Sequence, residues 1–361
     1  MTSRDKFQQL LRRELTNEIL VDYWAVPEID RRLMINYNVA TREDLLQQLG
    51  VDFRYLEGPA YEGPPLEVHA NGAVDDIWGV PRQRQATGEG EFAGSYEHVE
   101  TPPLANAKTV EDIEQYPHWP DPDWYEYSVI ADQAQAVPDH VRVFMGDRLN
   151  RVAQLKPAMY LRGVERALAD LARNSPVFQA INQRITEFYA EYLRRILAAG
   201  RGEIDLIFTG DDFGMQSRPL CRPQTWRAVL QPNFARFIQI SHDAGVPVAH
   251  HTCGSIYALI PDFISAGLDI LNPLQPFTAD MDFAQIKAEF GDHLLFHGGV
   301  SLQGALRFGT PAEVEQEVKE RVEVLGNGGG YILCTAHNIQ ADTPTENIIA
   351  LFDSYEKHRT L

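Results

Sequence analysis

The second half of the chain repeats one unit, in which a short apolar run is followed by a polar tip and then by a stretch with helical spacing. After Pro138 these apolar runs fall at residues 141–145, 203–208, 246–251, 268–271, 293–297 and 330–334. Strands that alternate with helices build parallel sheets, because each helix returns the chain to the edge where the next strand starts. A chain of 361 residues has room for one large barrel or two smaller domains. We predict an α/β fold, a modified TIM (β/α)8 barrel.

The first part of the chain lacks this rhythm. Residues 1–50 have helical character, and Thr41 followed by Asp44 is the pattern of a capping box at a helix start. The segment that follows is rich in glycine, proline and aromatic residues, which is typical of loops packed on apolar surface. We therefore predict one domain over residues 1–361, with an N-terminal helical and loop-rich extension and lid region at 1–137 and the barrel core at 138–361.

Composition narrows the class of protein. Hydrophobic residues make up 44% of the chain, enough for a large core, and the formal net charge of -19 argues against nucleic acid and anionic membrane surfaces as partners. Three cysteines do not imply a disulfide framework. The first residues carry no apolar signal region, and no apolar run is long enough to span a bilayer. The expected location is the cytoplasm.

The apolar run at 246–251 ends in polar residues that include a His-x-Cys pair. Alternate residues of a strand share a face, so His251 and Cys253 point one way and His250 points the other. Imidazole and thiolate are zinc ligands, and Cys334, which closes the last apolar run, is the third candidate. Three protein ligands and one open position are typical of a catalytic zinc. The alternative is that both cysteines are buried apolar side chains and His251 is a hydrogen-bonded core histidine.

The other polar tips complete a predicted active site, because catalytic groups of such barrels lie at the carboxyl ends of the strands. We predict catalytic roles for Asp211, Asp212 and His337, and substrate contacts for the residues Gln216, His297 and Asn338. Asp147 and Arg148 form a further polar tip of the same kind. Each aspartate has a structural alternative, because a loop aspartate often caps the following segment. His297 has one too, as an internal hydrogen-bonded histidine.

A cover for this site is predicted from composition. The segment from Tyr55 to Trp78 contains many Tyr, Gly and Pro residues without helical or strand period. Loops of this length are usually functional or disordered. We predict that it covers the barrel mouth and that Tyr61 and Trp78 contact the substrate; the alternative is a surface loop without a role.

Four stretches of the sequence resemble the uroporphyrinogen decarboxylase superfamily. They are Gly210-Asp-Asp-Phe-Gly-Met-Gln216, His251-Thr-Cys-Gly254, His297-Gly-Gly-Val300 and the Gly-Gly-Gly-Tyr-Ile-Leu-Cys sequence that ends at Cys334. They are most similar to its cobalamin-dependent methyltransferase branch, and the likeness covers nearly the whole chain. The resemblance implies a zinc site at His251, Cys253 and Cys334, in a modified TIM barrel.

The activity implied by the resemblance is methyl transfer between a corrinoid cofactor and a thiol, or another small acceptor or donor such as a methoxy compound. The chain lacks Asp-x-His-x-x-Gly, the usual corrinoid-binding motif, so the corrinoid is expected on a separate partner protein. The N-terminal Arg-Gln-Ala-Gly-Arg segment of the porphyrinogen decarboxylases is also absent. Two alternatives stay open: a cofactor-free decarboxylase that uses Asp211 or Asp212, and a non-catalytic barrel that binds a small ligand. A homodimer is left open as the assembly.

Overall fold

Eight parallel strands form a nearly closed barrel in the computed structural model, which describes residues 1–146 and 151–360. Their order around the sheet is β1-β13-β12-β11-β10-β9-β8-β2, and every neighbouring pair is parallel. The strands are β1 (Leu20–Val21), β2 (Phe53–Tyr55), β8 (Val141–Phe144), β9 (Leu206–Gly210), β10 (Val248–His251), β11 (Ile270–Asn272), β12 (Leu295–His297) and β13 (Tyr331–Leu333). The predicted α/β barrel class is confirmed.

Two of the eight strands come from the part of the chain that we had assigned to an extension. All six apolar runs after Pro138 are strands, but β1 and β2 precede them and complete the sheet. Between these two edge strands the Asp52 N–H donates to the Val21 carbonyl oxygen at 2.9 Å, and the Asp52 carboxylate accepts from the Val21 N–H at 2.8 Å. The barrel core therefore includes residues before 138.

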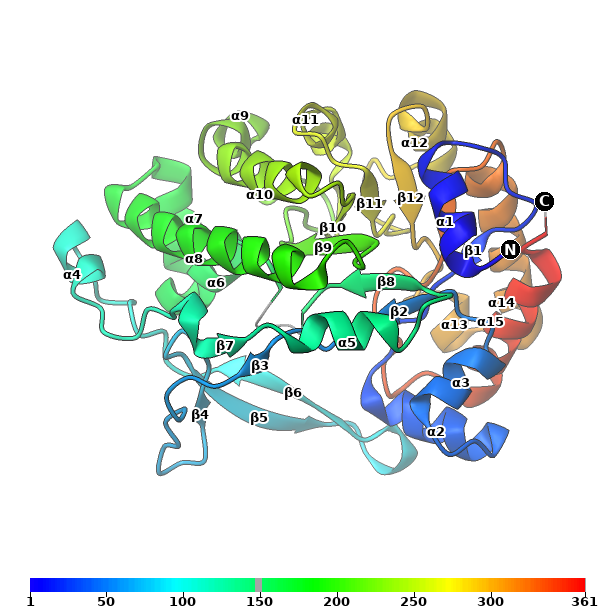
Figure 1. The fold of residues 1–361 in the computed structure, drawn as a ribbon, viewed down its shortest axis with the longest axis horizontal. Coiled ribbons are helices and arrows are strands. Elements are labelled where there is room, and N and C mark those ends of the chain that lie inside the picture. Colours follow the sequence, from blue (N-terminus) through cyan, green and yellow to red (C-terminus); the bar gives the residue numbers. More distant parts are fainter. Residues whose placement is uncertain (147–150, 361) are drawn as a thin grey trace.

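Helices alternate with the barrel strands and cover their outer face (Figure 1). Their starts follow the sequence signals: Thr41 and Asp44 form a capping box, and Ser175 caps a helix that begins with Pro176. None of the helices in the described ranges has the length and apolar character of a membrane span. The helices are α1 (Ser3–Leu11), α2 (Pro27–Tyr37), α3 (Arg42–Gln48), α4 (Val110–Glu114), α5 (Val129–Gln135), α6 (Leu155–Arg162), α7 (Val164–Arg173), α8 (Pro176–Gly200), α9 (Pro223–Thr225), α10 (Gln231–Asp243), α11 (Ile260–Ser265), α12 (Phe283–Phe290), α13 (Ala305–Phe308), α14 (Pro311–Arg321) and α15 (Thr345–His358).

A separate antiparallel sheet projects from the barrel. It consists of β4 (Val74–Asp75), β5 (Pro81–Thr87) and β6 (Gly94–Val99), and the two-stranded ladder of β3 (Ala60–Tyr61) and β7 (Tyr125–Glu126) lies between it and the barrel (Figure 1). The turn that joins β5 to β6 reaches α2, where the Arg32 guanidinium lies 5.9 Å from the centre of the Phe92 ring. This connection places residues 87–96 near one end of the barrel.

The interior of the barrel is filled by side chains in layers, as strand alternation requires. Ala249, Ile270 and Leu295 are register partners on β10, β11 and β12, and these three residues and Ile332 of β13 are apolar, inward-facing and buried. Phe7 and Leu10 of α1 belong to the same interior cluster. Two positions further along each of these strands, at the carboxyl ends, the inward-facing residues are His251, Asn272, His297 and Cys334. On each of these strands the residue at the carboxyl end therefore lies above a buried apolar one.

Candidate metal centre

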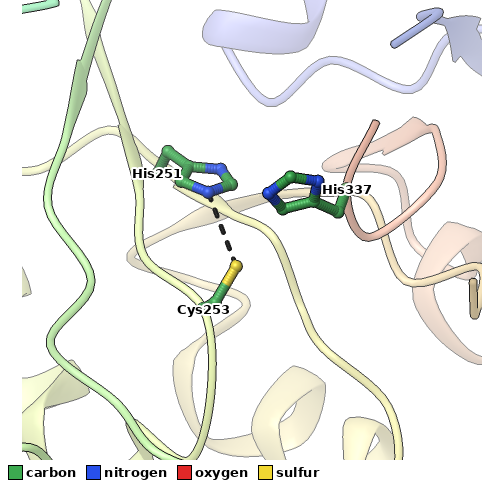
Figure 2. Close-up of side chains that lie close together, drawn as sticks. All are labelled: His251, Cys253 and His337. Carbon is green, nitrogen blue, oxygen red and sulfur yellow. Dashed lines mark hydrogen bonds between the residues drawn. The ribbon is translucent and has the colours of Figure 1, made fainter. Parts of the chain in front are cut away.

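Three donor side chains meet at the carboxyl end of the barrel. The ligand atoms of His251, Cys253 and His337 all lie within 4.8 Å of one another. His251 Nε2 is 3.5 Å from the Cys253 Sγ, and the rings of the two histidines are 5.6 Å apart between centroids. Figure 2 shows the two imidazoles next to each other, with the Cys253 thiol below them. His251 is buried, Cys253 is half-buried and His337 is exposed, so the group opens outward.

A carboxylate and an ammonium group lie beside these donors. Asp212 Oδ1 is 3.8 Å from His251 Nε2, and it accepts the Cys253 N–H at 3.2 Å. The other Asp212 oxygen forms an ion pair with Lys156 Nζ at 2.9 Å. Burial acts to raise the pKa of Asp212, but the charge and hydrogen bond of Lys156, the neighbouring His251 and the Cys253 N–H together outweigh it and hold this pKa below its usual range. Asp212 is therefore an anion at neutral pH, next to the donor group.

The protonation of the donors suits a bound cation. Burial and the positive charge of Arg151 hold the pKa of His251 well below its usual range, so its ring is neutral, as a metal ligand must be. Burial and the Asp212 carboxylate raise the pKa of the Cys253 thiol to about 12. A thiolate therefore forms here only with a cation beside it. Two imidazoles and a thiol within reach of one ion match the ligand types and number of a catalytic zinc site.

A second group of donors lies deeper in the barrel and contains Cys334. Asp22, His297 and Cys334 are all buried and their ligand atoms also lie within 4.8 Å of one another. The structure thus places Cys334 with Asp22 and His297, and puts His337 where we predicted Cys334. The physical reason is that pairing continues beyond β13, with a bridge between Val300 and Thr335. Cys334 therefore remains inside the barrel, and the chain reaches the mouth three residues later.

His250 lies on the opposite side of β10 from His251, as alternation predicts. Its ring stacks on Phe213 with centroids 5.2 Å apart, and its Nδ1 lies 2.8 Å from the Thr209 hydroxyl. Burial lowers the pKa of His250 to about 3. The side chain packs between strand and helices, away from the donors.

Asp211 takes the structural role that we weighed as its alternative. Its carboxylate accepts the backbone N–H groups of Gln154 at 2.7 Å, Leu155 at 3.0 Å and Lys156 at 2.6 Å, at the start of α6. Burial raises the pKa of Asp211 to about 6, although the three N–H groups act in the opposite direction. The residue is 1% exposed and does not line the cavity described below. Only Asp212 of the two neighbours lies beside the donors.

A cavity of about 620 Å³ opens above the donors. Cys253 and His337 form part of its floor, and the β5–β6 hairpin supplies an aromatic wall with Phe92 of the turn and Tyr96 of β6. Loops after the barrel strands add four primary amides, from Gln216, Gln275, Gln303 and Gln340. Arg307 is the only arginine or lysine among the described lining residues, and it forms an ion pair with Asp342. The cavity thus combines neutral polar groups with apolar surface.

The predicted cover is wrong in its residues. Trp78 is 1% exposed and packs on Phe188 and Tyr189 of α8, with ring centroids 5.2 and 5.6 Å away. Tyr61 lies against Trp124 and Tyr125, and its hydroxyl donates to the Pro64 carbonyl oxygen at 2.7 Å. Neither Tyr61 nor Trp78 lines the cavity. Trp78 is part of the core, and the cover is the later segment 87–96.

The remaining predicted site residues divide between cavity and interior. Gln216 lines the cavity, and its contact with a substrate stays a prediction. Asn338 does not line it; its N–H donates to the Nδ1 of the neighbouring His337 at 2.8 Å. His297 lies buried below the cavity in the second donor group. Asp147 and Arg148 lie outside the described residues.

Sequence reasoning missed Asp22 and Lys156. Asp22 follows a strand of only two residues, which carries too short an alternation to be recognised. Lys156 stands in the first turn of α6, and nothing in its local sequence indicates that it reaches Asp212. Both are brought to the site by the barrel.

Comparisons with known proteins agree with this architecture. The model of the family "Uroporphyrinogen decarboxylase (URO-D)" matches residues 97–358. A uroporphyrinogen decarboxylase of Thermus thermophilus is 28% identical over 178 residues, which cover 48% of this chain and 46% of that protein. One of Coxiella burnetii is 22% identical over 190 residues, covering 53% and 50%. The chain thus spans about half the length of the curated relatives it matches.

A solved structure described as a methyltransferase from Methanosarcina mazei is similar over 99% of both chains. The TM-score is 0.67 and the sequence identity 17%. At this identity the likeness shows a shared fold.

Proposed function

This chain belongs to the uroporphyrinogen decarboxylase family, and on that basis we propose that it is a zinc-dependent methyltransferase of the cobalamin-dependent branch. It would move a methyl group between a corrinoid carried by a separate protein and a thiol or another small molecule, such as a methoxy compound. One observation carries the proposal: His251, Cys253 and His337 form a donor group, and two of its members, Cys253 and His337, line the cavity. The fold shared with a methyltransferase supports it.

In this proposal His251, Cys253 and His337 hold the zinc, with His337 in place of the Cys334 that the resemblance implied. When bound, zinc supplies Lewis acidity, which keeps a thiol substrate deprotonated or polarises the heteroatom of a methyl donor. The three protein ligands leave a position for the substrate on the cavity side, where Cys253 and His337 are accessible.

Two further groups act on the substrate. Asp212, kept anionic by Lys156, is placed to accept the proton that a substrate thiol releases on binding. Phe92 and Tyr96 provide apolar surface that excludes water and holds the body of the substrate. Direction of transfer then depends on which methyl donor enters the cavity.

A decarboxylase is the second candidate, favoured by the names of the curated relatives. A porphyrinogen carries many carboxylates and calls for an arginine cluster. The described lining offers Arg307 alone, already paired with Asp342. Asp211, one of the two carboxylates proposed for such a reaction, is occupied at the start of α6. The charge of the cavity therefore favours methyl transfer.

The test is transfer of the methyl group from free methylcobalamin to a small thiol, followed by the change in corrinoid absorbance. We expect zinc-dependent demethylation by the wild-type protein and none above background by Cys253→Ala. Equal rates in the two proteins, or conversion of uroporphyrinogen by the wild type, would contradict the proposal.

A further inference from the structure

A chain of hydrogen bonds connects the two donor groups through the interior of the barrel. His251 Nδ1 lies 2.7 Å from Asn272 Oδ1, Asn272 Nδ2 lies 2.6 Å from His297 Nδ1, and His297 Nε2 lies 2.8 Å from Asp22 Oδ2. His251, Asn272 and His297 occupy facing positions on β10, β11 and β12. All four residues are buried. Each ring nitrogen and amide atom in this chain therefore depends on its neighbour for its hydrogen bond.

The acceptor at the far end of the chain is already well defined. Asp22 Oδ1 accepts the Tyr23 N–H at 2.7 Å, and Asp22 Oδ2 accepts the Tyr55 hydroxyl at 2.5 Å. The Tyr55 hydroxyl donates to Asp22 because its oxygen accepts from Trp24 Nε1, which can only donate. A carboxylate accepts hydrogen bonds and does not donate them. The His297 nitrogen that faces it must therefore carry a proton.

The proton on His297 Nε2 fixes the donor and acceptor roles of the next groups in the hydrogen-bond chain. In a neutral imidazole with its proton on Nε2, Nδ1 is an acceptor, so the NH2 group of Asn272 must face His297. The carbonyl oxygen of Asn272 then faces His251, whose Nδ1 must carry the proton. The lone pair of His251 consequently lies on Nε2, the nitrogen 3.5 Å from the Cys253 Sγ. With His297 neutral, the reverse orientation of Asn272 would set its carbonyl oxygen against His297 Nδ1, two acceptors with no proton between them, in a place closed to water.

We propose that Asp22, His297 and Asn272 are positioning residues that hold His251 in the one tautomer able to bind a metal through Nε2. Metal-ligating histidines are commonly oriented through their other ring nitrogen, and loss of such a partner weakens metal binding. Here the orienting group is a buried carboxylate that acts through two intermediate side chains. The metal role of His251 rests on the proposed function, whereas the tautomer does not.

The same contacts engage the nitrogen and oxygen donor atoms of the inner donor group, which consists of Asp22, His297 and Cys334. His297 Nε2 and Asp22 Oδ2 face each other, and the Asp22 oxygens already accept from Tyr23, Tyr55 and His297. Burial raises the pKa of the Cys334 thiol well above its usual range, as it raises that of the Cys253 thiol. Asp22 and His297 of this inner group thus orient His251 of the outer donor group, which consists of His251, Cys253 and His337.

The direct test is the protonation state of the two rings in the full-length protein after removal of metal by a chelator. Long-range proton–nitrogen NMR of protein with ¹⁵N-labelled histidine distinguishes the ring nitrogens, and single His251→Asn and His297→Asn variants assign them. We expect the proton on Nδ1 of His251 and on Nε2 of His297. A proton on Nε2 of His251, or an averaged mixture of tautomers, would overturn the proposal.

Variants at position 272 give a second test, with zinc affinity measured by competition with a chromophoric chelator. Asn272→Leu removes the acceptor, and zinc affinity should fall about 10- to 100-fold. Asn272→Asp keeps an acceptor for His251, so affinity should stay near that of the wild type while the NMR spectrum shows His297 doubly protonated. The matched control is His250→Leu, a similar change on the outer side of β10, which should leave affinity unchanged. Wild-type affinity in Asn272→Leu contradicts the positioning role.

The two experiments separate this proposal from the proposed function. If the two rings show the expected tautomers but the wild type binds no zinc, the metal role of His251 is refuted and the proposed hydrogen-bond chain stands. If the wild type binds zinc but metal-free His251 carries its proton on Nε2, the proposed hydrogen-bond chain is refuted and the metal role stands.

Discussion

At the scale of single residues, two neighbouring carboxylates have opposite environments. Asp211 is enclosed and accepts three backbone N–H groups, whereas Asp212 lies between Lys156 and the donor group. The sequence places them side by side and cannot distinguish them, because the difference arises from α6, which approaches only in the folded barrel. Their substitution should therefore have separate effects.

Asp211→Ala should lower stability and leave zinc content unchanged. Loss of a side chain that satisfies the start of a helix costs about 1–2 kcal/mol in the free energy of unfolding. Urea denaturation measures this change. Full stability with loss of all catalytic activity would instead assign Asp211 to the reaction.

Asp212→Asn should retain zinc and lose activity. The amide can still accept the Cys253 N–H but cannot take a proton from a substrate thiol. If Asp212 is the general base, methyl transfer should slow about 100-fold or more at neutral pH. An unchanged rate would remove Asp212 from the mechanism.

At the scale of elements, the sequence predicted those parts of the barrel that carry their own pattern. The six later strands are apolar runs followed by helices, and hydrophobic periodicity is sufficient to recognise them. β1 and β2 have only two and three residues, and they are strands because the neighbouring strands pair with them. The aromatic residues from Tyr55 to Trp78 were mistaken for a cover because composition does not tell which surface a loop packs on.

In the candidate site, too, local sequence pattern predicted some features and long-range pairing decided the others. Alternation along one strand correctly placed His251 opposite His250, since both lie within a regular element. It could not choose between Cys334 and His337, because that depends on how far pairing continues after β13. Local patterns therefore predict the direction of a side chain, and long-range pairing decides its depth.

Substitutions in the two aromatic segments should separate cover from core. Phe92→Ala and Tyr96→Ala should change the KM for the thiol or methyl donor and leave the free energy of unfolding nearly unchanged, because both side chains are exposed at the cavity. Trp78→Ala should cost about 3–5 kcal/mol, as expected for a large buried aromatic residue. Denaturation and steady-state kinetics on the same three proteins check this prediction. A kinetic effect of Trp78→Ala without loss of stability would instead support the prediction that Trp78 contacts the substrate.

At the scale of the whole molecule, the barrel brings distant parts of the chain to one end. Asp22 comes from the end of the first strand, Lys156 from α6, His251 and Cys253 from the middle, and His337 from beyond the last strand. The apolar layer below and the β5–β6 turn above enclose these groups. The proposed chemistry depends on a metal ion at the outer donor group, which consists of His251, Cys253 and His337.

The most direct measurement is the zinc content of the protein purified without added metal, determined by elemental analysis for the wild type, Cys253→Ala and Cys334→Ala. We expect about one zinc per chain in the wild type and in Cys334→Ala, and none in Cys253→Ala, because Cys253 alone of the two thiols belongs to the outer group. Wild-type protein without zinc, zinc retained by Cys253→Ala, or zinc lost from Cys334→Ala while the chain stays folded would contradict the account.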